Sequence, residues 1–234
     1  MSTGAALRAY LAASSRPAPP APPPTRPPAE LVGRPVPPRP VVPELAPLPE
    51  EVVVHRRLKS AFIDFDALIA SLRVDRLTGY VRAQARDFEG ILLFARGERG
   101  LSCFRGETVV TGPRAGELVR RRALEDDVLL DVVRVRSITA GMLPRLFTGP
   151  ARHIGFTRFL HVGELIGSLV DERTDAVVMV SGRLDTGVVV VRGGRVDSAW
   201  TRLHPRPLTS LQVVLAAAPE PTARVEIFTA SGDG

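Results

Sequence analysis

The feature of this sequence that most constrains its fold is an internal duplication. When the chain is aligned with itself at an offset of 97 residues, positions 62–103 fall on positions 159–200 without a gap. Ten positions are identical: Phe62/Phe159, Leu68/Leu165, Ile69/Ile166, Ser71/Ser168, Leu72/Leu169, Arg76/Arg173, Val81/Val178, Arg86/Arg183, Gly90/Gly187 and Gly97/Gly194. Because hydrophobic periodicity repeats together with the identities, we expect two copies of one small fold.

Each copy shows the same succession of patterns. An apolar helical spacing is followed by a polar break, a short strand, a glycine-turned hairpin, a second helix and a last strand. In the first copy we expect strands at 80–83, 91–94, 101–104 and 128–135 and a second helix at 115–124; in the second copy, strands at 177–180, 188–191, 196–200 and 223–228 and a second helix at 208–218. The predicted fold class is therefore α+β, with two tandem α-β-β-β-α-β units and mainly antiparallel sheets, preceded by a disordered proline-rich tail.

The division of the chain follows from where its prolines lie. Fifteen of the 22 prolines precede residue 50, and proline both fixes φ and removes an amide donor. We expect a short amphipathic peptide at 1–15 and a disordered linker at 16–50, which serves as a polyproline II spacer or as a ligand of an aromatic groove. The first unit is then placed at 52–137, a connector at 138–157 and the second unit at 158–230.

One strand carries a further prediction about packing. Residues 188–191 are all valine, which is typical of a strand covered on both faces. A unit of about 75 residues is marginal alone. We therefore expect helices on one face of this strand and the sister unit on the other.

The pattern of the two copies resembles the small domain of unknown function at the N-terminus of PatA-type response regulators, which also occurs in other bacterial signalling proteins. In the first copy the resemblance lies in the helix residues Leu68, Ile69 and Leu72, the strand entry Thr78, Gly79 and Val81, and the hairpin residues Gly90, Leu92, Phe94 and Gly97. In the second copy it lies in Leu165, Ile166, Leu169, Gly187, Val189, Val191, Gly194 and Ala199. The resemblance implies a bacterial regulatory or scaffolding role without a known activity.

Residues that could carry catalysis or hold a metal show no supporting pattern. Cys103 is the only cysteine, and the duplication sets it against Trp200, as expected for two equivalent packing positions. The four histidines have no spacing typical of metal ligands, and no glycine-rich phosphate-binding motif occurs. We expect no catalytic site, no metal and no cofactor, and hence a protein that is not an enzyme.

Two arginine clusters are the candidate contacts with nucleic acid or an acidic partner. Arginine carries nearly all of a formal net charge of +6, since Lys59 is the only lysine. The candidates are Arg56, Arg57, Arg120, Arg121 and Arg122. Acidic residues lie close to them in the sequence, so a solvated, neutralised helix face is the alternative interpretation.

The first residues of the chain supply a candidate contact with a protein partner. Leu7, Tyr10 and Leu11 have spacings compatible with a short amphipathic helix that would become ordered on a partner. No apolar run is long enough to cross a bilayer, and Arg8 interrupts the only stretch similar to a secretion signal. We expect a cytoplasmic adaptor or regulatory module that binds a protein partner or forms a homo-oligomer, with arginine-mediated nucleic-acid binding as the alternative function.

Overall fold

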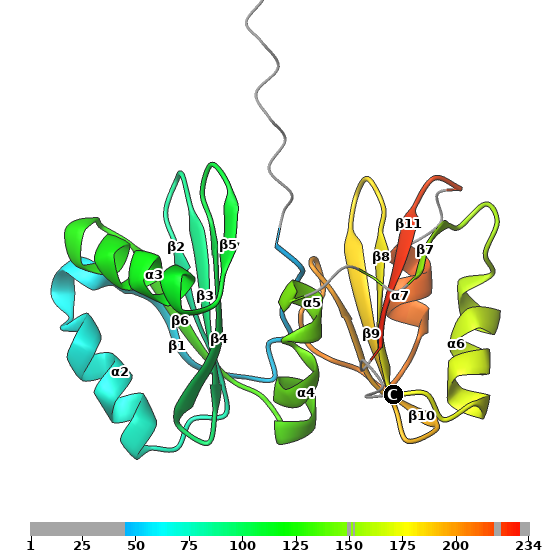
Figure 1. Cartoon of the computed structure of the whole chain (residues 1–234), viewed down its shortest axis with the longest axis horizontal. Coiled ribbons are helices and arrows are strands. Elements are labelled where there is room, and N and C mark those ends of the chain that lie inside the picture. Colours follow the sequence, from blue (N-terminus) through cyan, green and yellow to red (C-terminus); the bar gives the residue numbers. More distant parts are fainter. Residues whose placement is uncertain (1–44, 149–150, 152, 218–220, 230–234) are drawn as a thin grey trace, which may run out of the picture. The chain divides into compact units, whose positions relative to one another are not determined.

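Two antiparallel β-sheets form the framework of the protein (Figure 1). The computed structural model describes residues 45–148, 151, 153–217 and 221–229. The first sheet has six strands in the order β1-β6-β2-β3-β4-β5, and the second has five in the order β10-β9-β8-β11-β7. The strands of the first sheet are β1 (Val52–Lys59), β2 (Gly79–Gln84), β3 (Glu89–Ala95), β4 (Glu98–Arg105), β5 (Val109–Thr111) and β6 (Leu129–Arg134). Those of the second are β7 (His153–Phe156), β8 (Ala176–Ser181), β9 (Thr186–Arg192), β10 (Arg195–Thr201) and β11 (Arg224–Thr229).

The helices are short, and two of them, α2 (Phe65–Val74) and α3 (Pro113–Glu125), begin at a recognisable start signal. The Asp64 side chain accepts a hydrogen bond of 3.0 Å from Ala67 N and so caps the helix that follows, while Pro113 opens the longest helix. The helices are η1 (Ser60–Phe62, a 3-10 turn), α2 (Phe65–Val74), α3 (Pro113–Glu125), α4 (Ser137–Met142), α5 (Arg145–Thr148), α6 (Val162–Asp171) and α7 (Gln212–Ala217).

The duplication predicted from the sequence is present in the fold. α2 and α6, β2 and β8, and β3 and β9 begin and end at positions that differ by the same 97 residues. The strand order β1-β6-β2-β3-β4 of the first sheet matches β7-β11-β8-β9-β10 of the second. Even the turn after each first helix repeats, because Arg76 and Arg173 both have a positive φ. The prediction of two tandem, mainly antiparallel α+β units is confirmed.

Each unit also begins with a strand that the sequence analysis missed. β1 pairs with β6 and β7 with β11, so the repeated unit is β-α-β-β-β-α-β. β7 lies inside the predicted connector 138–157, which therefore ends before His153. The register of β1 shifts twice, between Val53 and His55 and between His55 and Leu58, and such bulges break the alternation that identifies a strand. β7 has only four residues, one of them glycine.

The two faces of each sheet are covered differently. α2 and α3 cover one face of the first sheet, and α6 and α7 cover one face of the second (Figure 1). The other faces share a central core with α4 and α5, to which β3, β9 and β10 contribute among other strands. Val188 and Val190 lie in this central core, whereas Val189 and Val191 lie under the helices. The expectation that this strand is covered on both faces is confirmed.

The segment 45–51 corrects the predicted boundary of the linker. Residues 45–50 were assigned to the disordered stretch 16–50, yet Leu45 and Leu48 are buried in the central core. We call residues 45–51 the strap. The prediction failed because proline argues against helix and sheet but not against an extended segment buried by side-chain contacts. The rest of the linker and the peptide with Leu7, Tyr10 and Leu11 lie outside the described residues.

Two glycines at contrasting positions give a test of this packing. Gly167, inside α6, has open space where a Cβ would be, so Gly167→Ala should raise the free energy of unfolding by about 0.5–1 kcal/mol through lower unfolded-state entropy. A Cβ on Gly187 of β9 would come within 2.8 Å of Val214 Cγ1 of α7. Gly187→Ala should therefore lower the free energy of unfolding by roughly 1–3 kcal/mol. Urea denaturation of both variants measures the difference, and equal effects would contradict the packing of α7 on β9.

Candidate functional site: a groove beside helix α6

A groove lies between α6 and the edge of the second sheet. It has a volume of about 540 Å³ and largely apolar walls. We call it the α6 groove. It is lined by Leu165, Ser168 and Leu169 of α6, by Glu172 at its C-terminal cap, by Val225, Ile227 and Thr229 of β11, by His153, Ile154 and Gly155 of β7, and by Leu160 and Thr174 from the adjoining loops.

Local periodicity explains why these residues meet. Positions 165, 168, 169 and 172 recur at the spacing of one helix face, so α6 presents a single stripe toward the sheet. Positions 225, 227 and 229 alternate along β11 and therefore lie on one face of the sheet. Strand pairing places Gly155 opposite Val225 and His153 opposite Ile227, which extends this floor to the edge strand.

Comparison with the first unit shows why the groove is open. In the first sheet Leu58 of β1 pairs with Leu130 and packs against the core beneath α2 and α3, whereas Gly155 of β7 takes the equivalent place. A side chain at position 155 would overlap Leu160, which crosses over the glycine. The strand position that carries leucine in one unit is thus left without a side chain in the other.

A second difference also reduces the side-chain volume of the second unit. Leu77, which is 1% exposed, and Thr174 follow α2 and α6 at equivalent positions, and both backbone amides bond to the carbonyl of the equivalent helix residue at 2.9 Å. The backbone is the same, but threonine is smaller and polar. Phe65, at the start of α2, is likewise replaced by the smaller Val162 at the start of α6. The second unit therefore has less side-chain volume at the positions that fill the first.

A few polar groups accompany the aliphatic lining of the groove. His153, Ser168 and Glu172 stand at the margins of an otherwise aliphatic surface. Within the described ranges, no group of three His, Cys, Asp or Glu side chains is placed to hold a metal ion. An aliphatic hollow with a few polar groups is the usual character of a binding site for an apolar ligand or segment.

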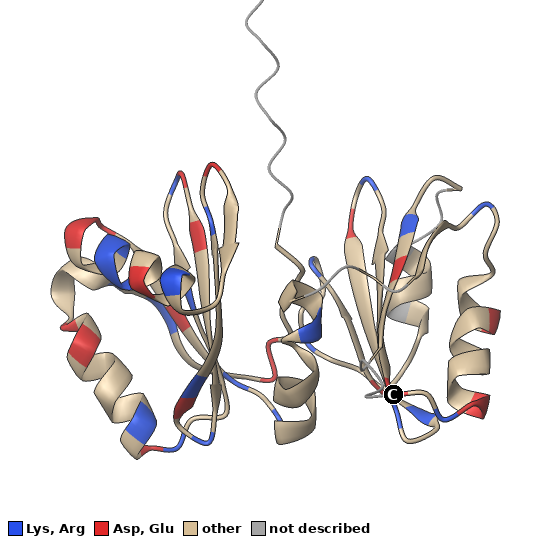
Figure 2. Cartoon of the chain, viewed as in Figure 1, with Lys and Arg blue, Asp and Glu red and all other residues tan. Residues whose placement is uncertain are grey.

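Basic and acidic residues are interspersed along α3 (Figure 2), and four of the five arginines singled out in the sequence pair with carboxylates through their side chains. Arg56 pairs with Glu50 of the strap, and Arg57 occupies a left-handed position on β1 from which its backbone N donates to Asp131. Arg120 forms two hydrogen bonds to Asp66 of α2, and this contact lowers the pKa of the Asp66 carboxyl. These pairs join separate segments of the first unit.

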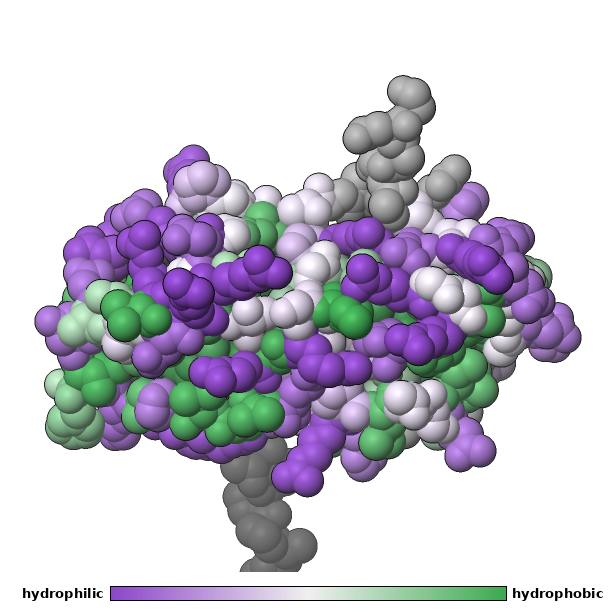
Figure 3. Space-filling view, turned by 90° about the horizontal axis from the view of Figure 1, so that it is seen from below, coloured by the Kyte–Doolittle hydropathy of each residue, from purple (hydrophilic) through white to green (hydrophobic). Residues whose placement is uncertain are grey.

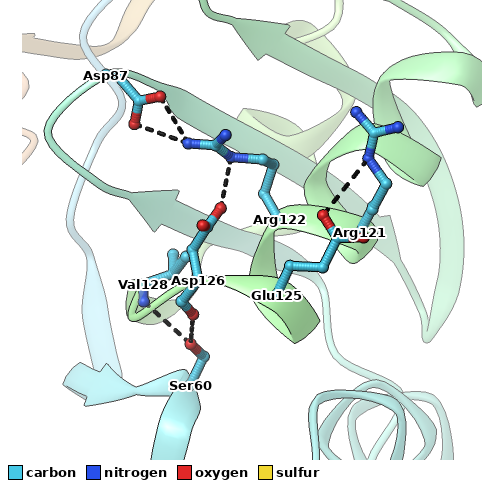
Figure 4. Close-up of polar contacts among 7 residues, drawn as sticks. All are labelled: Ser60, Asp87, Arg121, Arg122, Glu125, Asp126 and Val128. Carbon is cyan, nitrogen blue, oxygen red and sulfur yellow. Dashed lines mark hydrogen bonds and ion pairs between the residues drawn. The ribbon is translucent and has the colours of Figure 1, made fainter.

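The two remaining arginines of α3 differ in how firmly they are held (Figure 4). Arg122 hydrogen-bonds to Asp87, lies 2.7 Å from Asp126 and stacks over the Phe88 ring at 4.8 Å. Arg121 has only a 3.9 Å ion pair with Glu125, one turn further along the helix. Each of the three consecutive arginines thus meets its own carboxylate, as the neutralised-face interpretation expects.

Cys103 lies in the central core, as its alignment with Trp200 predicts. The two residues occupy equivalent positions on β4 and β10, and their side chains are 1% and 0% exposed. Burial raises the pKa of the Cys103 thiol to about 11, so the nucleophilic thiolate is scarce at neutral pH. Both residues fill matching interior positions.

Sequence reasoning missed the α6 groove, although a signal for it was present. The identities between the two copies indicate their shared fold, whereas the groove depends on the positions where the copies differ. At the same offset of 97 residues Leu58 falls on Gly155 and Leu77 on Thr174. A comparison of side-chain volumes along the alignment would have indicated an underfilled second unit.

Comparisons of the chain with protein-family models, with curated proteins and with solved structures found no match. Across the described part of the chain, no helix has the length and apolar character needed to cross a membrane.

The arginines of α3 provide a test of their structural role. We expect Arg122→Ala to lower the free energy of unfolding by roughly 1–2 kcal/mol, because it removes the partner of two carboxylates and an aromatic stacking contact. Arg121→Ala, the matched control on the same helix, should change it by less than about 0.5 kcal/mol. Thermal and urea unfolding would measure both, and equal losses would contradict the arrangement in Figure 4.

The burial of Cys103 predicts slow thiol chemistry in the folded protein. Alkylation by iodoacetamide should remain slow from pH 7 to 9, because the pKa of about 11 keeps the thiol protonated and the side chain is inaccessible. In denaturant the rate should rise to that of a free cysteine and increase with pH over the same range. Rapid labelling of the native protein near pH 7 would show that Cys103 is not buried.

Proposed function

We propose that this protein is a non-enzymatic interaction module, an adaptor or regulatory component of a bacterial signalling or scaffolding system in the cytoplasm. Its α6 groove receives an aliphatic segment of a protein partner. The observation that carries this proposal is a contrast between the two units. Their backbones are arranged alike, but large side chains fill the space beside the helix in the first unit, whereas a groove lies there in the second unit, at Gly155 and Thr174.

The edge strand beside the groove favours a protein partner. β7 is the last strand of the second sheet, so one side of it has no strand partner among the described residues. Two of its side chains, Ile154 and Phe156, are exposed. An exposed edge strand offers backbone donors and acceptors to an incoming strand, whose alternate side chains can then enter an adjoining groove. A segment that pairs with β7 and inserts aliphatic side chains into the groove between α6 and β11 satisfies both features.

The groove differs from the ordinary exposed hydrophobic surface of the protein. On the face shown in Figure 3, hydrophobic side chains form separate patches that hydrophilic residues interrupt. Isolated exposed apolar residues are ordinary on protein surfaces, whereas an apolar hollow next to an unpaired strand is not. The buried, protonated Cys103 supports a non-enzymatic role, and the resemblance to the PatA-type N-terminal domain is part of the same proposal.

The proposal is tested by closing the groove. Thr174→Leu introduces the residue found at the equivalent position of the first unit, so the backbone accepts it and the groove loses volume. We expect this variant to fold with unchanged or higher stability and to lose partner binding by at least tenfold. Thr209→Leu, which adds the same side chain at an exposed site away from the groove, is the matched control.

The measurement is quantitative affinity capture with a photo-crosslinking residue at Ile154. A partner retained by the wild type and by Thr209→Leu, lost with Thr174→Leu and crosslinked through an aliphatic segment would support the proposal. If the crosslinked protein is a second copy of this chain, the module is a homo-oligomer. If Thr174→Leu captures and crosslinks the same proteins as the wild type, the groove is not the binding site.

A further inference from the structure

The strap is bound in the central core in the manner of an extended peptide ligand. Its sequence, Leu-Ala-Pro-Leu-Pro-Glu-Glu, forms neither helix nor strand, and its two leucines, Leu45 and Leu48, are buried in the central core shared by the two sheets. It precedes β1, the first strand of the described chain. The strap therefore combines a buried, specific contact with the absence of sheet pairing.

Aromatic side chains from both sheets recognise its backbone. Trp200 Nε1 of β10 donates to the carbonyl of Pro47 at 2.9 Å, and the Tyr80 hydroxyl of β2 donates to the carbonyl of Pro49 at 3.2 Å. Burial raises the pKa of Tyr80, so its hydroxyl remains a donor. A third carbonyl, that of Leu45, accepts from Arg202 at 3.2 Å. Side-chain donors thus bind every second carbonyl from Leu45 to Pro49.

The acidic end of the strap is held by charge. The Glu51 carboxylate accepts from Arg136 N at 2.7 Å, from Arg136 Nε at 3.2 Å and from Thr139 Oγ1 at 2.8 Å. Glu50 pairs with Arg56. The residues around the strap therefore contact three chemical features of it: the leucine side chains, the prolyl carbonyls and the two carboxylates at its end.

This combination is the chemistry of proline-rich peptide recognition. Proline offers no N–H, so an extended proline segment is bound through its carbonyls by indole or phenol donors in an aromatic-lined cleft. We propose that the cleft around Trp200 and Tyr80 is a binding site for extended Leu-x-Pro-Leu-Pro-acidic segments. The strap fills it in cis, and a segment of the same chemistry from a partner protein replaces the strap. This site is separate from the α6 groove and does not depend on it.

The strap is suited to exchange because side chains, and not strand pairing, hold most of its backbone. One hydrogen bond of 2.8 Å, from Glu50 N to Pro205 O, is its backbone–backbone contact with the rest of the described chain, whereas β1 pairs with β6 at five positions. The strap can therefore leave while the sheet stays paired. A tethered ligand acts at an effective concentration in the millimolar range, so a free peptide at micromolar concentration competes poorly until the strap is weakened.

The experiment uses the full chain and a fluorescent peptide with the sequence of residues 45–51. In Leu45→Ser/Leu48→Ser, which removes the buried leucines of the strap, we expect the peptide to bind at least tenfold more tightly than in the wild type. Adding Tyr80→Phe to this variant removes one carbonyl donor and should weaken peptide binding about tenfold, in line with the penalty for an unsatisfied buried acceptor. A peptide with alanine for both prolines is the control ligand, and fluorescence anisotropy gives each Kd.

The outcomes separate this inference from the proposed function. The inference is overturned if the folded double variant does not bind the peptide, or if it binds the alanine peptide equally well. Thr174→Leu, which fills the α6 groove, should leave peptide binding unchanged. If the double variant does not fold, the wild type provides the second measurement. Millimolar peptide should then accelerate hydrogen exchange of the strap amides, and unchanged exchange at saturating peptide also overturns the inference.

Discussion

The constraint on which this fold depends is that each sheet has a second apolar face that its own helices do not cover. α2 and α3 bury only one face of the first sheet, and α6 and α7 only one face of the second. The remaining faces meet in a central core, where Tyr80, Cys103 and Trp200 lie with α4, α5 and the strap. Neither unit could leave this face in water without losing much of its hydrophobic stabilisation. The two units are therefore parts of one cooperative body.

Much of this architecture follows from patterns that the sequence displays. The four successive valines 188–191 predict a strand buried on both faces, and the alignment of Cys103 with Trp200 predicts two equivalent interior positions. Helix spacing and glycine turns locate α2, α6 and the hairpins to within a few residues. These features are local or repeated, and local patterns are what sequence reasoning reads best.

The features that were missed depend on distant contacts. β1 is a strand because β6 lies beside it, and its bulges hide the alternation that would reveal it. The strap is ordered because Trp200 and Tyr80, far along the chain, bond to its carbonyls. The arginines of α3 resemble a basic surface until Asp66 and Asp87 are seen opposite them. The α6 groove depends on the small side chains of Gly155 and Thr174, which differ from Leu58 and Leu77 and so are not among the residues shared by the two copies.

Duplication explains how a small fold can support binding without losing stability. Once two copies share a central core, the helix-covered side of one copy can lose volume while the other stays fully packed. Leu58 and Leu77 keep the first unit filled, and their counterparts Gly155 and Thr174 are free to form an opening. A groove lowers the stability of the fold because packing contacts are lost. The second unit can tolerate that loss because the first unit remains fully packed.

The position of the strap has a consequence for biosynthesis. The ribosome makes residues 45–51 before every element that holds them, and the indole of Trp200 emerges some 150 residues later. The first sheet can bury its central face only after the second unit has been made, and the strap gains its full binding site only when β10 has been added. Burial of this segment thus marks a completed chain, and a product truncated before β10 would leave its leucines and prolines accessible to chaperones and proteases.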